Sequence, residues 1–155
     1  MKHFRAYLIV LAFAGAIFSS CKQEQLFPDE PMLAFKEYRY NGADTLTTVF
    51  YFTDGDGDIG VEPTGNDYNM MLTLYYKDAN GEYQVARPGI STTDSIAYTY
   101  RIPELPDGQN GLEGDIHLVV NSAMITYDTI QFNAYIVDQT SHKSAVIRTP
   151  EFALR

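Results

Sequence analysis

The sequence lacks a second cysteine, because Cys21 is the only one among its 155 residues. No intramolecular disulfide can therefore stabilise the chain, and apolar burial must supply that stability. Tryptophan is also absent, whereas tyrosine and phenylalanine occur 12 and 9 times. A composition rich in tyrosine and β-branched residues favours β-strands. We find no internal repeat and no low-complexity tract.

Basic residues are scarce, with 11 Lys and Arg against 20 Asp and Glu. A surface with this imbalance repels nucleic acids and anionic lipid headgroups. The composition therefore excludes nucleic-acid binding as an expected function. It favours cations and basic proteins as partners.

Motifs that would indicate catalysis are missing as well. The chain has no Gly-x-Ser-x-Gly turn, no His-Glu-x-x-His pair and no phosphate-binding loop. Asp115 and His117 offer an acid–base pair, but they equally fit an exposed pair on one face of a strand. We therefore do not expect an enzyme. A small glycan hydrolase, which needs only two carboxylates, is the least favoured alternative.

What is present begins with a distinctive N-terminus. Lys2 and Arg5 precede an apolar stretch over residues 6–18, which is shorter than the roughly 20 residues that span a membrane. Small residues then lead to Cys21, and the whole resembles the lipobox of bacterial lipoproteins. We therefore predict a lipoprotein signal peptide over residues 1–20 and lipidation of Cys21. An ordinary signal peptide with a chance cysteine is the alternative.

Lipidation of Cys21 predicts how the remaining chain is held. Each buried acyl CH₂ contributes about 0.8 kcal/mol, so two or more chains anchor a protein stably. Lys22 follows the cysteine, with no acidic residue there to indicate retention in the inner membrane. We expect the outer membrane, facing either the periplasm or the cell surface. Residues 21–31, with two prolines and little apolar content, are predicted to be a lipidated tether.

Residues 32–155 show short strand-like segments separated by turn signals. Without Lys2 and Arg5, nine basic residues face 20 acidic ones, a net charge of −11 for the mature chain. Asn80-Gly81 suits a tight hairpin, and Ile130 to Ile136 alternate between two faces. The pattern predicts an all-β, immunoglobulin-like antiparallel β-sandwich of about 7–8 strands. A small β-barrel is the alternative. The predicted strands are Leu33–Tyr40, Thr47–Thr53, Met70–Lys77, Glu82–Ala86, Ser95–Ile102, Gly114–Ser122, Thr129–Val137 and Lys143–Thr149.

The sharpest chemical signal is an acidic loop in which Asp54, Asp56 and Asp58 alternate with glycine. Glycine lets the backbone curl tightly, so the three carboxylates can converge on one centre. Ca²⁺ takes six to eight oxygen ligands, and Glu62 is close enough in sequence to add one. The loop is not an EF-hand, because it lacks the required glycine and glutamate. A solvated acidic turn without an ion is the alternative.

Topology adds a further candidate ligand to this loop. If Thr47–Thr53 and Thr129–Val137 are strands B and F of a sandwich, both run in the same direction. The loops that follow them then meet at one end of the domain. Asp138 begins the second loop, where it is placed either to complete a cation site or simply to cap the turn.

Residues 52–60, Phe-Thr-Asp-Gly-Asp-Gly-Asp-Ile-Gly, resemble a set of uncharacterised Bacteroidota outer-membrane lipoproteins that carry this phrase after an early strand. The resemblance implies a lipid-anchored β-domain and supplies no catalytic residues. We expect a cell-envelope binding module, stabilised by Ca²⁺, with a protein or glycan partner. The alternative is an accessory subunit of an outer-membrane or secretion assembly that binds no ligand itself.

Overall fold

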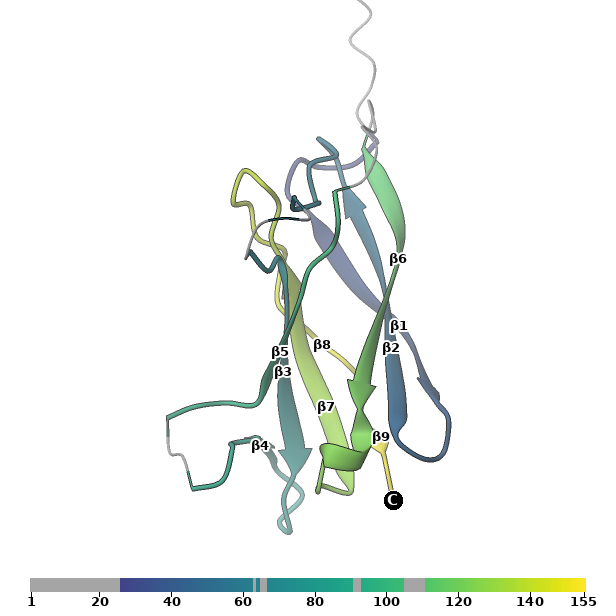
Figure 1. Ribbon diagram of the computed structural model, residues 1–155, viewed down its shortest axis with the longest axis vertical. Coiled ribbons are helices and arrows are strands. Elements are labelled where there is room, and N and C mark those ends of the chain that lie inside the picture. Colours follow the sequence, from purple (N-terminus) through teal and green to yellow (C-terminus); the bar gives the residue numbers. More distant parts are fainter. Residues whose placement is uncertain (1–25, 63, 65–66, 91–92, 105–110) are drawn as a thin grey trace, which may run out of the picture.

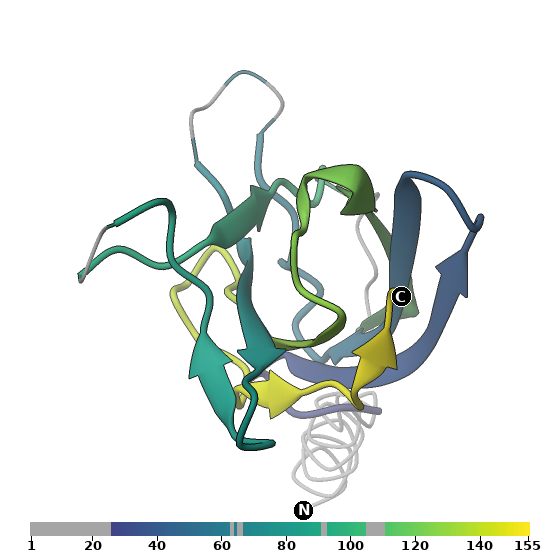
Figure 2. The same ribbon diagram turned by 90° about the horizontal axis from the view of Figure 1, so that it is seen from below.

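The computed structural model describes residues 26–62, 64, 67–90, 93–104 and 111–155. The predicted signal peptide, Cys21 and the first part of the predicted tether lie outside this range. The described chain is all β apart from one 3₁₀ turn at Ser122–Met124. Its strands form two separate antiparallel sheets that face each other (Figures 1 and 2). The predicted β-sandwich is therefore confirmed, and the sheets do not close into a barrel.

The order of the strands is that of an immunoglobulin-like sandwich. If β1, β2, β3, β6 and β7 are labelled A, B, C, E and F, then A, B and E share one sheet and C and F the other. The first sheet has the order β1 (Met32–Tyr40), β2 (Thr45–Asp54) and β6 (Leu112–Asn121). The larger sheet has the order β4 (Tyr83–Val85), β3 (Met70–Lys77), β7 (Thr129–Ile136) and β8 (Ile147–Arg148). Two further strands complete it: β5 (Ala97–Tyr100) pairs with β3, and β9 (Phe152–Ala153) pairs with β7.

The predicted C-terminal strand is much shorter than expected. In place of a continuous Lys143–Thr149, only β8 is regular, and β9 follows separately. The reason is that hydroxyl groups replace part of the ladder: the Thr149 hydroxyl accepts from the Phe132 N–H at 2.8 Å, and the Ser144 hydroxyl from the Ile136 N–H at 3.1 Å. Pro150 then interrupts the pairing, because it has no N–H to donate.

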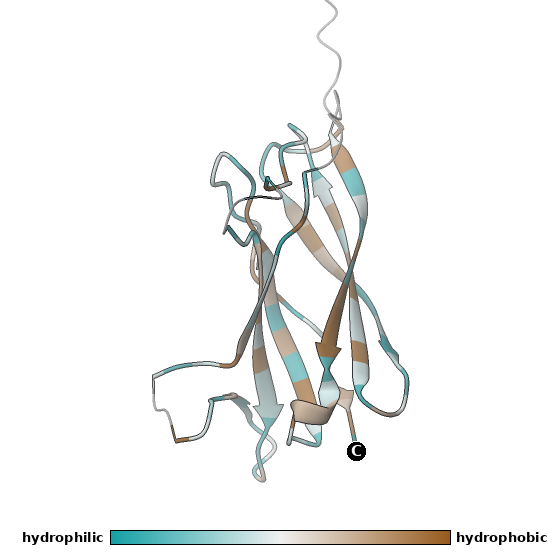
Figure 3. Ribbon diagram, in the orientation of Figure 1, coloured by the Kyte–Doolittle hydropathy of each residue, from teal (hydrophilic) through white to brown (hydrophobic). Residues whose placement is uncertain are grey.

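The core lies between the sheets and follows the alternation of the sequence. Polar and apolar residues alternate along the strands, as Figure 3 shows. Phe50 of β2 and Phe132 of β7 are fully buried, and they join one continuous cluster fed by both sheets. Burial of such side chains contributes about 1.5–3 kcal/mol each. The core therefore fixes β2 and β7, the two strands from which the acidic loops extend.

The acidic loop after β2 and the Asp138 loop after β7 lie at the same end of the sandwich. The chain leaves β2 after Asp54 and leaves β7 after Ile136 at the upper end in Figure 1, far from the C-terminus. The Gln139 N–H donates to the Asp58 carbonyl at 3.2 Å and ties the two loops together. The sequence-based expectation that these loops meet is confirmed.

Candidate functional site

The loop after β2 is shaped by glycine and anchored by one apolar residue. Gly57 has a φ of +78°, a left-handed conformation that glycine adopts at little cost and that turns the chain back on itself. Ile59 is fully buried, so the far side of the turn is fastened to the core. The Val61 N–H then donates to the Ile102 carbonyl at 3.0 Å. The turn is therefore held at both ends.

Asn69 holds this loop in place through hydrogen bonds of its side chain, a role that the sequence did not predict. Its side-chain amide donates to the Ile59 carbonyl at 2.6 Å, and its side-chain oxygen accepts from the Ile102 N–H at 2.7 Å. Its backbone carbonyl accepts from the Val137 N–H at 2.8 Å. One buried residue thus connects the β2 loop, the end of β5 and the end of β7. A single asparagine before an apolar strand carries no sequence signal for this role.

The second loop holds Asp138 in a fixed position. The Asp138 carboxylate accepts from the His142 N–H at 2.7 Å, from the Thr140 hydroxyl at 3.1 Å and from the His142 Nδ1 at 2.9 Å. Its side chain is fully buried, whereas that of His142 is 43% exposed. The loop therefore points one buried carboxylate toward the acidic turn.

Four of the five predicted carboxylates come together. One oxygen from each of Asp54, Asp56, Asp58 and Asp138 lies within 4.8 Å of the others, and we call this group the carboxylate cluster. Glu62 is not part of it. Glu62 instead lines a neighbouring cavity of about 450 Å³ that it shares with Tyr68, Asp138 and others. The acidic turn thus places its aspartates in one group and its glutamate beside that group.

Asp54 is the critical member of the cluster. Its residue is fully buried, and neither of its carboxylate oxygens has a hydrogen-bond partner of good geometry, although the nearby Ile59 N–H works weakly to lower its pKa. One oxygen of Asp58 is also buried without a partner. Among the described residues, the other buried and unpartnered side-chain atoms are uncharged groups of Thr48, Thr53, Ser122 and Gln131. An unpaired buried carboxylate costs far more than an unpaired hydroxyl or amide.

The electrostatics of the cluster follow from this burial. Desolvation first, and then the charges of its three acidic neighbours, raise the pKa of Asp54 to about 6. Desolvation first, and then the charges of Asp138 and Asp56, raise the pKa of Asp58 above its ordinary value. Burial works to lower the pKa of His142, but the charge and the hydrogen bond of Asp138 outweigh it and raise that pKa. Mutual repulsion therefore works against the ionised cluster, and a positive charge among these oxygens would relieve it.

No Lys or Arg of the described chain forms an ion pair with the carboxylate cluster. The basic group that contacts the cluster is the His142 imidazole, which pairs with Asp138. The oxygens belong to hard carboxylate ligands, supplied by two loops that the fold holds together. A divalent cation is the ligand that this donor set suits.

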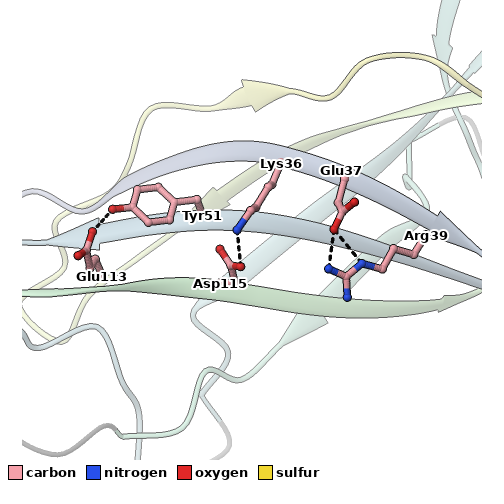
Figure 4. A network of polar contacts seen from close by, with 6 residues as sticks. All are labelled: Lys36, Glu37, Arg39, Tyr51, Glu113 and Asp115. Carbon is pink, nitrogen blue, oxygen red and sulfur yellow. Dashed lines mark hydrogen bonds and ion pairs between the residues drawn. The ribbon is translucent and has the colours of Figure 1, made fainter.

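Asp115 and His117 do not form an acid–base pair of their own. Asp115 accepts from Lys36 at 2.6 Å, on the outer face of the three-stranded sheet (Figure 4). His117 is exposed on the same strand.

Comparison of the chain with protein-family models, with curated proteins and with solved structures finds no match. Among the described residues, no helix is long and apolar enough to cross a membrane.

Proposed function

We propose that this chain is a lipid-anchored module of the bacterial cell envelope whose β-sandwich binds Ca²⁺ at the carboxylate cluster. Cys21 carries the anchor in the outer membrane, and the cation stiffens the loops that the domain presents to a protein or glycan partner. The site binds and organises; it performs no reaction in this proposal.

The observation that carries the cation site is the buried and unpartnered carboxylate of Asp54. A carboxylate excluded from water needs a proton, a hydrogen-bond donor or a cation to offset its desolvation. The first is insufficient at neutral pH, because a pKa of about 6 leaves Asp54 mainly ionised. The second is insufficient, because neither oxygen has a hydrogen-bond partner of good geometry and the nearby Ile59 N–H lowers the pKa less than burial and the acidic neighbours raise it. A cation is the remaining way to offset the desolvation.

Ca²⁺ suits the cluster better than Mg²⁺. Ca²⁺ accepts several carboxylates in an irregular shell, whereas Mg²⁺ keeps most of its waters and binds through one or two carboxylates. The cluster offers four carboxylates from two loops. We therefore assign Ca²⁺ as the preferred ion, with Asp54, Asp56, Asp58 and Asp138 as its ligands.

Thermal unfolding of the whole protein in mild detergent tests this assignment. With free Ca²⁺ at about 100 times the Kd, linkage predicts a gain of roughly 2.7 kcal/mol over the same protein in EGTA. Glu62→Gln is the matched control, because it removes a nearby carboxylate that lies outside the cluster, and its gain should be preserved. Identical curves with Ca²⁺ and with EGTA would contradict the cation site.

The anchor is tested separately by fractionation. Replacing Cys21 by alanine removes the only thiol of the chain, so the variant should move from the membrane fraction to the soluble fraction. Retention of the Cys21→Ala protein in the outer membrane would show that the lipobox interpretation is wrong.

A further inference from the structure

The segment that precedes β1 lies against the carboxylate cluster. Gly55, between the ligands Asp54 and Asp56, faces the backbone of residues 27–28. A Cβ atom built on Gly55 would clash with the carbonyl oxygens of both Phe27 and Pro28. The β2 loop at Gly55 therefore forms a docking site for residues 27–28, which we call the seat. Its shape depends on the absence of a side chain at position 55.

A second glycine completes the seat from the other side. A Cβ atom on Gly111, just before β6, would lie 2.9 Å from the Asp54 carbonyl oxygen and 3.1 Å from the Phe27 ring. Phe27 is half-buried there, whereas its neighbour Leu26 is 74% exposed. Gly111 thus lies against the Phe27 ring, while Gly55 lies against the Phe27 backbone carbonyl.

We propose that the cation at the carboxylate cluster stabilises the docking of the membrane-proximal segment, residues 26–31, against the domain. Ion binding then shortens the undocked chain between the domain and the lipid anchor at Cys21. The proposal rests on the cation site and on the lipid anchor at Cys21 proposed above. Without the ion, repulsion among four carboxylates spreads the turn that carries Gly55. The seat for Phe27 and Pro28 is then lost.

The consequence is a change in reach. With Phe27 seated, the chain between Cys21 and the domain spans at most about 20 Å when fully extended. With the segment released up to the buried Leu33, the same span rises to about 40 Å. The ion would therefore set how far, and in which orientations, the sandwich stands from the membrane.

A single tryptophan reports on the seat, because the natural chain contains none. In the whole protein in detergent, the Phe27→Trp emission should shift to shorter wavelength with Ca²⁺, and its quenching by acrylamide should fall relative to EGTA, because a docked side chain is shielded from the quencher. Tyr127→Trp is the matched control. Tyr127 is a half-buried aromatic stacked on Tyr76 at the other end of the sandwich, and its signal should not respond to Ca²⁺.

Reciprocity supplies a second readout that does not depend on the bulk of tryptophan. If the ion favours docking, docking must favour the ion by the same factor. Calorimetric titration with Ca²⁺ should therefore show about fivefold or greater weakening in both Phe27→Ala and Gly55→Ala. Gly55 does not have a positive φ, so alanine there obstructs the seat without straining the turn.

The outcomes separate this inference from the cation site itself. Ca²⁺ binding with unchanged Phe27→Trp emission and undiminished affinity in Phe27→Ala would overturn the coupling and leave the cation site standing. Absence of Ca²⁺ binding to the unmodified protein would overturn both. A response of the Tyr127→Trp control equal to that of Phe27→Trp would show a global change and would also overturn the coupling.

Discussion

The outer face of the three-stranded sheet and the loop end of β2 differ in how their carboxylates are partnered. Along the outer face of the sheet, acidic groups on β1 and β6 are paired. Lys36 donates to Asp115, Arg39 donates to Glu37, and the Tyr51 hydroxyl donates to Glu113 (Figure 4). Where β2 ends, Asp54 is buried with no partner. The same sheet thus carries paired carboxylates on β1 and β6 and an unpaired one at the end of β2. The carboxylates on the sheet therefore already have partners, whereas the cluster leaves a buried charge that the proposed cation would offset.

Replacing Asp54 by asparagine should give the largest effect on stability, and one whose sign depends on Ca²⁺. In EGTA the variant should be about 1–2 kcal/mol more stable than the natural protein, because it removes one buried charge from a repelling group. In saturating Ca²⁺ it should be less stable by up to about 3 kcal/mol, because a ligand is lost. Urea unfolding under both conditions measures this change of sign.

Asp115→Asn is the matched control on the paired face. It removes a carboxylate from an exposed ion pair with Lys36, which contributes less than about 1 kcal/mol. The effect should be the same with Ca²⁺ as with EGTA. A sign reversal in Asp115→Asn, or its absence in Asp54→Asn, would remove the distinction between the two regions.

Asn69→Ala tests the brace that holds the two loops in place. It leaves the buried Ile59 carbonyl and the Ile102 N–H without their partners, at about 1–3 kcal/mol. Because the brace is independent of the ion, the loss should appear both with Ca²⁺ and with EGTA. Asn133→Ala is the control, since Asn133 is half-buried and accepts only a long bond of 3.3 Å from Arg148. Equal losses in the two variants would contradict the bracing role of Asn69.

Periodicity and turn chemistry were enough to predict the sandwich and the meeting of the two loops. The alternation in Thr129–Ile136 and the Asn80-Gly81 turn are local signals; the first strand forms as expected, and the turn closes the β3–β4 hairpin with a positive φ at Gly81 alone. The rest depends on contacts between distant residues. Asn69 is recognisable only from its four hydrogen-bond partners, and the contact of Phe27 with Gly55 joins segments that nothing in their spacing relates.

The Lys143–Thr149 prediction was right only in part, for a related reason: the segment lies along β7, but only Ile147–Arg148 is regular strand. The segment has strand-like composition, but the hydroxyls of Ser144 and Thr149 take over part of the backbone pairing. Glu62 shows the same limit at the site. Its closeness in sequence suggested a ligand, yet the chain turns it into the neighbouring cavity. Sequence distance along a loop does not determine which way a side chain faces.

The pH dependence of the ion-free protein gives the smallest expected effect and sharpens the contrast further. Asp54 takes up a proton near pH 6 in the folded state and near its ordinary value of 3.8 in the unfolded state. The folded state therefore binds more protons between these values, and this contribution, present in full below about pH 3.8, is lost as pH rises through 6. Carboxylates with lowered pKa, such as Asp78 and Glu151, act in the opposite sense, because their contribution is lost as pH falls.

The difference between the natural protein and Asp54→Asn isolates the one group. In EGTA, the free energy of unfolding of the natural protein, minus that of the variant, should fall by about 1–2 kcal/mol between pH 4.5 and 7.5. Saturating Ca²⁺ should remove this fall, because the cation takes the place of the proton as the partner of the carboxylate. A flat difference for Asp54→Asn would mean that the buried carboxylate is stabilised by the fold alone and that the cluster has no need of an ion.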